Sequence, residues 1–238
     1  MPITLTAGSS TALPGTPVLP PKGLNTSLYL DLNHTARSTA WAHGFMHAYA
    51  LWLGPTLLVA VFLIAYASAW WRRAGRACAL LILAGIGTLA ALGLNQLVGH
   101  AARELRPYRT HPHVLVLVGR SNDYSFPSDH AVLAGSLIAA MLVALGPSVW
   151  RSSRAVRATG RPRVVVWLSV VNVLFGLFLC FGRVYVGVHY PGDVVAGLLL
   201  GMVVVAVVSL LRPIAYRLAG LVRHRAFGSL LARPGAAF

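Results

Sequence analysis

The stretch Ser121–Ala131, S-N-D-Y-S-F-P-S-D-H-A, places polar and titratable side chains immediately before a long apolar run. Such side chains are costly to bury in lipid, so their presence at the mouth of a membrane helix indicates a chemical role. Two other polar segments interrupt apolar sequence in the same way: A-R-E-L-R-P-Y at Ala102–Tyr108 and G-R-V-Y-V-G-V-H-Y-P-G-D at Gly182–Asp193. We interpret the three segments as parts of a single site.

The composition around these segments is that of an integral membrane protein. Of the 238 residues, 57% are hydrophobic and 11% are charged, which is not the balance of a soluble domain. The two cysteines, Cys78 and Cys180, lie inside apolar runs and predict no disulfide framework.

Five apolar runs are long enough to cross a membrane, which takes roughly 17 to 25 helical residues. The sequence therefore predicts an all-α polytopic membrane bundle with five transmembrane helices and a transmembrane domain at residues 48–212. The predicted spans are Ala48–Trp70, Ala77–Val98, His130–Trp150, Val164–Phe181 and Val194–Leu211. Mid-span Pro55, Asn95, Gln96 and Asn172 are interpreted as packing or kink features.

The flanking segments differ from the bundle in composition. Residues 1–23 are rich in Pro, Thr, Ser and Gly and predict a flexible extracytoplasmic tail. Residues 24–47 mix apolar and polar positions and predict a helix at the membrane surface. Residues 213–238 predict a basic cytoplasmic tail. Within the last span, G-L-L-L-G at Gly197–Gly201 is a close-packing motif that suits either the bundle or a dimer.

The arginines predict the orientation of the chain. The formal net charge is +15, and 13 of the 20 basic residues follow the first, third and fifth spans. Short basic loops remain in the cytoplasm, so this clustering indicates topology rather than nucleic-acid binding. We therefore expect a cell-membrane protein whose three polar segments, with all five acidic residues, lie on the extracytoplasmic side.

Basic residues on the outer side point to an anionic ligand. Arg103, Arg106 and Arg183 lie in the polar segments, and a guanidinium group binds phosphate oxygens bidentately. Arg109 and Arg120 have no motif around them and are interpreted as lipid-headgroup anchors.

Two residues at the start of the third span fit the same ligand. Ser128 follows Pro127, so it is expected at or near a helix N-cap, where free N–H groups attract anions. His130, in the first turn, could act as a general acid.

His189 and Asp193 are spaced i, i+4, which places both on one helix face if the last helix begins near Pro191. A carboxylate bonded to one ring nitrogen leaves the other nitrogen free to attack. A metal site of His130, His189 and Asp193 is an alternative, but converging arginines would repel a divalent cation. No metal and no cofactor are expected.

Together the segments resemble the three signature motifs of the type-2 phosphatidic acid phosphatase superfamily. The matching residues are Arg106-Pro107, Pro127-Ser128-Asp129-His130, and Arg183 followed by His189 and Asp193. The resemblance implies a helical bundle in which His189 forms a phosphohistidine, His130 protonates the leaving group and Asp193 orients the nucleophile. It also implies phosphate binding by Arg106, Ser128 and Arg183, without a metal.

The sequence departs from the family pattern at two positions. Gly99 stands where the first motif usually has a lysine, and Arg103 is our candidate for the missing charge. Gly182 stands where the third motif usually has serine. Asp129, a further candidate phosphate-site residue, with Tyr124-Ser125-Phe126 before it, resembles the branch that cleaves undecaprenyl diphosphate.

The expected function is therefore removal of the terminal phosphate from a lipid phosphate or diphosphate, with undecaprenyl diphosphate as the first candidate substrate. Phosphatidic acid and phosphatidylglycerol phosphate are alternatives, because headgroup choice depends on pocket shape. A non-enzymatic lipid or phosphate carrier is a rival of another class, and it leaves the two histidines and Asp193 without a purpose. Membrane lipids are the expected surroundings, and the sequence does not fix the oligomeric state.

Overall fold

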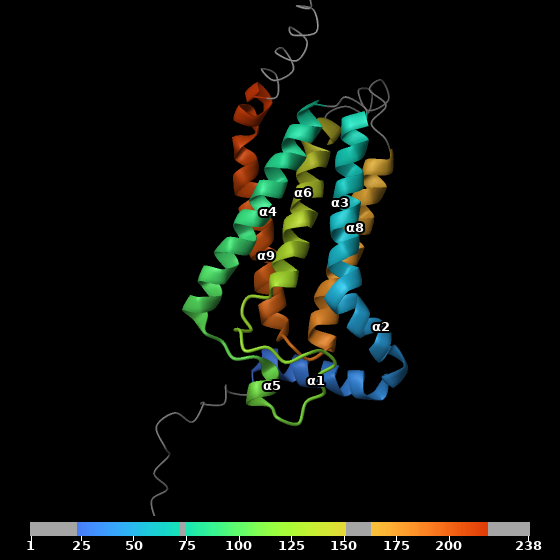
Figure 1. The fold of residues 1–238 in the computed structure, drawn as a ribbon, viewed down its shortest axis with the longest axis vertical. Coiled ribbons are helices and arrows are strands. Elements are labelled where there is room, and N and C mark those ends of the chain that lie inside the picture. Colours follow the sequence, from blue (N-terminus) through green and yellow to red (C-terminus); the bar gives the residue numbers. More distant parts are fainter. Residues whose placement is uncertain (1–22, 72–74, 151–162, 219–238) are drawn as a thin grey trace, which may run out of the picture.

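The computed structural model describes residues 23–71, 75–150 and 163–218, which form helices joined by loops and contain no strand, as the all-α prediction expects. Residues 1–22 of the predicted N-terminal tail, most of the basic loop arginines and most of the predicted tail at 213–238 lie outside this part. Five long helices run side by side (Figure 1). They are α3 (Gly54–Trp71), α4 (Gly75–Ala102), α6 (Asp129–Trp150), α8 (Arg163–Tyr185) and α9 (Pro191–Val208).

Four helical stretches are long and apolar enough to cross a membrane, and they correspond to the first, second, fourth and fifth predicted spans. The third predicted span is α6, whose 22 residues are enough to cross a membrane and whose part Asp129–Leu145 is apolar. The first stretch begins earlier than predicted, because a short helix α2 (His43–Ala48) and a π-helical turn η2 (Tyr49–Leu53) continue into α3. Pro55 has no N–H to donate to the carbonyl one turn before it, which explains the widened turn at this place.

Helices α6 and α9 pack with their backbones in contact. A Cβ atom on Gly201 would lie 2.2 Å from the Val132 carbonyl oxygen, and one on Gly197 would lie 2.7 Å from the Ser128 carbonyl oxygen. Only glycine permits this approach. The G-L-L-L-G motif therefore packs within the bundle, and it holds the start of α6 against the start of α9.

A short helix α1 (Leu24–Ser38) lies across one end of the bundle, beside α5 (Pro107–Thr110) (Figure 1). The Tyr29 hydroxyl donates to the Gly187 carbonyl at 3.1 Å. The Asn33 side chain donates to the Leu115 carbonyl at 2.8 Å and accepts from the Leu115 N–H at 3.0 Å. Helix α1 thus fastens two loops at this end of the molecule, and its placement at a membrane surface stays a prediction.

The remaining short elements are the 3₁₀ turns η1 (Ala40–Ala42) and η3 (Ser209–Leu211). Arg76, at the start of α4, lies 5.5 Å from the ring centre of Tyr216, at the end of the bundle opposite α1. Arg76 is the basic residue of the first predicted cytoplasmic loop that the structure describes. It therefore lies at the end of the bundle away from the three polar segments.

Candidate active site

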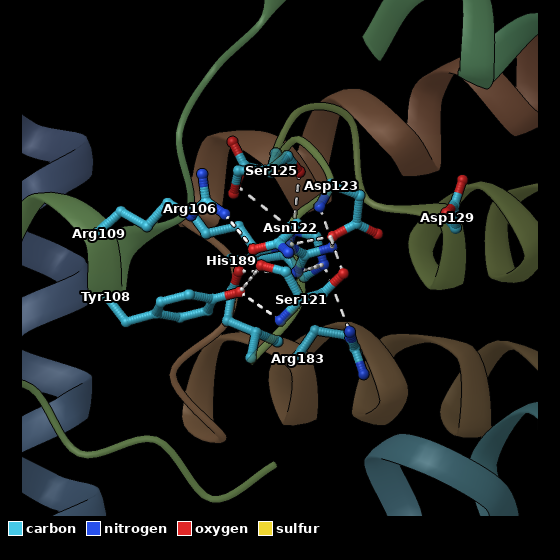
Figure 2. A network of polar contacts seen from close by, with 12 residues as sticks. Arg106, Tyr108, Arg109, Ser121, Asn122, Asp123, Ser125, Asp129, Arg183 and His189 are labelled. Carbon is cyan, nitrogen blue, oxygen red and sulfur yellow. Dashed lines mark hydrogen bonds and ion pairs between the residues drawn. The ribbon is translucent and has the colours of Figure 1, made fainter. Parts of the chain in front are cut away.

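The three polar segments meet at the α1 end of the bundle. The Ser125 N–H donates to the Glu104 carbonyl at 2.8 Å, which joins the second segment to the first. The Ser128 N–H donates to the Asp193 carbonyl at 3.1 Å, which joins it to the third. Figure 2 shows Arg106, Ser125 and His189 gathered in one polar network.

His189 lies at the centre of this network and is only 2% exposed. Its Nδ1 lies 2.8 Å from the Ser125 carbonyl oxygen, which can only accept, so Nδ1 carries the proton and Nε2 carries a lone pair. That lone pair faces NH1 of Arg106 at 3.3 Å and NH2 of Arg183 at 3.5 Å. The imidazole therefore presents an unprotonated nitrogen to two cationic groups.

Burial is the main cause that lowers the pKa of His189 to about 4, and the two guanidinium charges act in the same direction. The Asp193 carboxylate opposes this shift. The ring is consequently neutral at pH 7, which is the form that a nitrogen nucleophile requires.

Asp193 lies beside His189 but forms no hydrogen bond with it. Its Oδ2 lies 3.6 Å from Nδ1, beyond hydrogen-bond length. The same oxygen accepts from the Ser125 hydroxyl and, at 2.8 Å, from the N–H of Tyr190. The carboxylate is 1% exposed, so it is a buried charge held by two donors at the start of α9.

Arg106 and Arg183 are both buried, at 7% and 6% exposure. The Nε and NH2 groups of Arg106 each lie 2.9 Å from Asp123 Oδ1, which leaves NH1 directed at the Val188 carbonyl and at His189. Arg183 donates from NH1 to the Ala50 carbonyl, in the π-helical turn η2, while its buried Nε has no partner. Two buried guanidinium groups with a single carboxylate bonded to them favour an additional anion.

Ser128 precedes the first residue of α6, as predicted, but its hydroxyl does not cap the helix. The side chain is fully buried and Oγ has no partner. His130 is half-buried in the first turn, within electrostatic range of Arg106, Arg183 and His189. An unpartnered hydroxyl and an unpartnered Nε of Arg183 are the donors that a phosphate group would satisfy.

Two candidate residues lie outside this network. The Asp129 side chain is exposed, and its Oδ1 accepts from Asn95 at 2.6 Å and from Gln96 at 2.9 Å, both on α4. Figure 2 shows it apart from the group around His189. The Arg103 side chain is exposed, and its Nε donates to the His100 carbonyl at 3.2 Å.

Three contributing residues were not among the predicted site residues. Ser125 and Asp123 belong to the quoted stretch, but nothing in their spacing distinguishes them from loop residues. Asn95 was interpreted as a packing feature, whereas its side chain also donates to the Pro127 carbonyl at 3.1 Å and so holds the turn before α6. An amide side chain in the middle of an apolar span was the available signal.

The backbone of Arg103 makes a clean test of its role possible. Its φ is 53°, in the left-handed region that favours glycine, so Arg103→Gly removes the guanidinium without straining the chain. We expect turnover within about threefold of wild type, whereas loss of a preorganised phosphate donor lowers kcat by about 10² to 10³. Arg106→Lys is the comparison, since it removes a buried fork in the same segment. A hundredfold loss in Arg103→Gly would show that this side chain reaches the phosphate.

A helical membrane bundle with a buried histidine between two arginines defines a class of membrane phosphatases, and comparison with known proteins agrees. The family model described as PAP2 superfamily matches residues 74–217, and the chain belongs to this family. The recognition made from the three motifs is thereby confirmed.

Among curated relatives, the chain is 33% identical over 123 residues to the undecaprenyl-diphosphatase BcrC of Bacillus subtilis (strain 168), covering 52% of this chain and 53% of that protein. It is also 33% identical over 128 residues to the decaprenylphosphoryl-5-phosphoribose phosphatase of Mycobacterium tuberculosis (strain CDC 1551 / Oshkosh), covering 54% and 59%. The matches thus span about half the length of these relatives.

A solved structure shares the fold. The PAP2-type phosphatidylglycerolphosphate phosphatase from Bacillus subtilis superposes with a TM-score of 0.55 at 19% identity, covering 76% of this chain and 83% of that one. At this identity the likeness concerns the fold alone.

Proposed function

We propose that this protein hydrolyses the terminal phosphate of a lipid phosphate or diphosphate through a phosphohistidine on His189. The observation that carries the proposal is the state of the His189 ring, with Nδ1 protonated towards Ser125 and the Nε2 lone pair facing two guanidinium groups. A carrier needs the arginines but has no use for a buried, neutral, oriented imidazole. The geometry therefore favours an enzyme over a binding protein.

The proposed reaction has two displacements. In the first, Nε2 of His189 forms a bond to phosphorus while the bond to the leaving oxygen breaks and its electron pair departs with that oxygen. Arg106, Arg183 and Ser128 hold the non-bridging oxygens and stabilise the charge spread over them in the transition state. The protonated form of His130 supplies a proton to the leaving oxygen, and the phosphate charge close by favours that form.

In the second displacement, water attacks the phosphohistidine and His130 takes its proton. The phosphorus–nitrogen bond breaks, its electron pair returns to Nε2, and inorganic phosphate leaves. Both histidines then have their starting protonation states. No described group of three His, Cys, Asp or Glu side chains is arranged to hold a metal ion, and metal independence stays a prediction for the chelator assay below.

Undecaprenyl diphosphate is the substrate that we propose. The resemblance of Tyr124–Asp129 to the corresponding branch supports it, as does the name of the Bacillus relative. A prenyl-linked phosphate monoester is the second candidate, because the mycobacterial relative and the Bacillus relative have the same sequence identity to this chain, 33%. Phosphatidic acid and phosphatidylglycerol phosphate remain alternatives on the same chemistry.

We also propose that the site faces the extracytoplasmic side. The supporting observation is the clustering of basic residues after the first, third and fifth spans, opposite the polar segments. A lipid carrier recycled at the outer face would reach the site from that leaflet.

The deciding experiment measures phosphate release by the purified protein in detergent from undecaprenyl diphosphate, undecaprenyl phosphate, phosphatidic acid and phosphatidylglycerol phosphate. We expect the highest kcat/KM with the diphosphate, and equal rates with and without EDTA. A water-soluble short-chain prenyl diphosphate, added to sealed right-side-out vesicles, tests the face. Binding of all four lipids without any phosphate release would establish the carrier instead, and hydrolysis only in inverted vesicles would reverse the orientation.

A further inference from the structure

Ser125 uses every one of its polar groups to join the site together. Its N–H donates to the Glu104 carbonyl, its hydroxyl donates to Asp193 Oδ2, and its carbonyl accepts from His189 Nδ1 at 2.8 Å. The side chain is 0% exposed. A single buried serine therefore contacts the nucleophilic ring through its backbone and the buried carboxylate through its side chain.

No hydrogen bond joins Asp193 directly to His189 in this arrangement. The carboxylate oxygen closest to the ring lies 3.6 Å from Nδ1 and already has two donors, the Ser125 hydroxyl and the Tyr190 N–H. The carboxylate thus acts on the ring as a nearby charge, while the hydrogen bond that selects the tautomer is donated by Nδ1 and accepted by the Ser125 carbonyl.

We propose that Ser125 is the positioning residue that couples Asp193 to His189 in the reaction proposed above. Its carbonyl keeps the proton on Nδ1, so that Nε2 can attack, and its hydroxyl holds the carboxylate at a distance from the ring. As Nε2 bonds to phosphorus the ring becomes cationic, and the Ser125 carbonyl and the Asp193 charge both stabilise that state.

Removal of the hydroxyl has a predictable electrostatic consequence. In Ser125→Ala the Asp193 oxygen loses one of its two donors and can turn onto Nδ1. A closer carboxylate favours the protonated imidazolium, so the pKa of His189 rises. The charged groups around the ring that oppose or support this change are Arg106 before α5, Arg183 on α8, His130 on α6 and Asp193 on α9.

The test compares Ser125→Ala with Ser136→Ala. Ser136 is also fully buried in the bundle, on α6, but its hydroxyl has no partner and lies outside the network. In Ser125→Ala we expect kcat to fall by about 10- to 100-fold with little change in KM, as for other residues that orient a reacting group. We also expect the acidic limb of the pH–kcat profile to move to higher pH by about one unit. Ser136→Ala should match wild type, and Ser125→Thr, which keeps a hydroxyl, should recover part of the loss.

Titration of His189 by NMR in ¹⁵N-histidine-labelled protein reads the same coupling without substrate. A pKa that rises in Ser125→Ala supports the proposal even if the lipid substrate has been misassigned, and absence of phosphate release by wild type refutes only the proposed function. An unchanged His189 titration in a folded Ser125→Ala protein overturns the coupling. Equal losses in Ser125→Ala and Ser136→Ala, or a loss that is the same at every pH, overturn it as well.

Discussion

His189→Ala releases no phosphate from any lipid in the panel and takes up no ³²P from labelled substrate after a denaturing quench at alkaline pH. This is the largest effect that we expect. Among the residues that surround the ring, Arg106 and Arg183 are cationic donors, and the Ser128 hydroxyl has no base bonded to it. Without Nε2 the transferring phosphate would be bound with nothing to attack it.

His189→Asn is the matched control for folding. Its amide can still donate to the Ser125 carbonyl and so preserve this contact of the network, but it has no nucleophilic nitrogen. Both variants should elute as wild type does from size exclusion in detergent. Covalent labelling of either one would refute the phosphohistidine on this residue.

His130→Ala should lower kcat by about 10² to 10⁴ when the leaving group is an alkoxide, as in a lipid monophosphate, because general-acid help matters most when charge builds on a poor leaving oxygen. A lipid diphosphate releases a phosphate-stabilised anion, so its loss should be much smaller. Rates of His130→Ala and wild type on undecaprenyl phosphate and undecaprenyl diphosphate measure the difference.

The exposed loop residue His113 supplies a control, because it is a histidine at the same end of the molecule and lies outside the network. His113→Ala should match wild type on both substrates. Equal losses in His130→Ala for the monophosphate and the diphosphate would contradict a general acid and indicate that His130 only binds phosphate.

The bundle was predictable because long apolar runs in a membrane protein have few alternatives to helices. The start of the first span was not, since residues Ala40–Ala48 mix polar and apolar side chains, and a hydropathy pattern does not show that they continue one helix. The sequence left open whether Gly197 and Gly201 pack within the bundle or form a dimer contact. Their close contact with α6 shows packing within the bundle.

The site was predictable as a set of residue types and less so as a set of contacts. The motifs predicted a common site at one end of the bundle for four residues: Arg106, Ser128, Arg183 and His189. The i, i+4 spacing predicted that His189 and Asp193 face each other, and Asp193 Oδ2 lies 3.6 Å from Nδ1. The hydrogen bond from Nδ1 to the Ser125 carbonyl joins two distant segments, so the spacing does not show it.

The positions of Arg103 and Asp129 depended on local geometry that spacing does not contain. Arg103 has a positive φ at the end of α4, which directs its side chain to the His100 carbonyl. Asp129 accepts hydrogen bonds from Asn95 and Gln96 on α4. The sequence shows that these two residues are polar, but it does not show that Asp129 is their partner. For Arg103 we therefore expect no large contribution to phosphate binding, and phosphate binding by Asp129 stays a prediction.

The contacts of α1 determine when this helix can dock during synthesis of the chain. Tyr29 bonds to Gly187, 158 residues later, and the Asn25 side chain accepts from the N–H of Gly192, 167 residues later. Because the chain leaves the ribosome from its N-terminus, α1 must wait through the insertion of almost every other helix before its partners exist. The helix that is synthesised first is therefore among the last to dock, and a chain truncated before residue 187 has no complete site to release into the membrane.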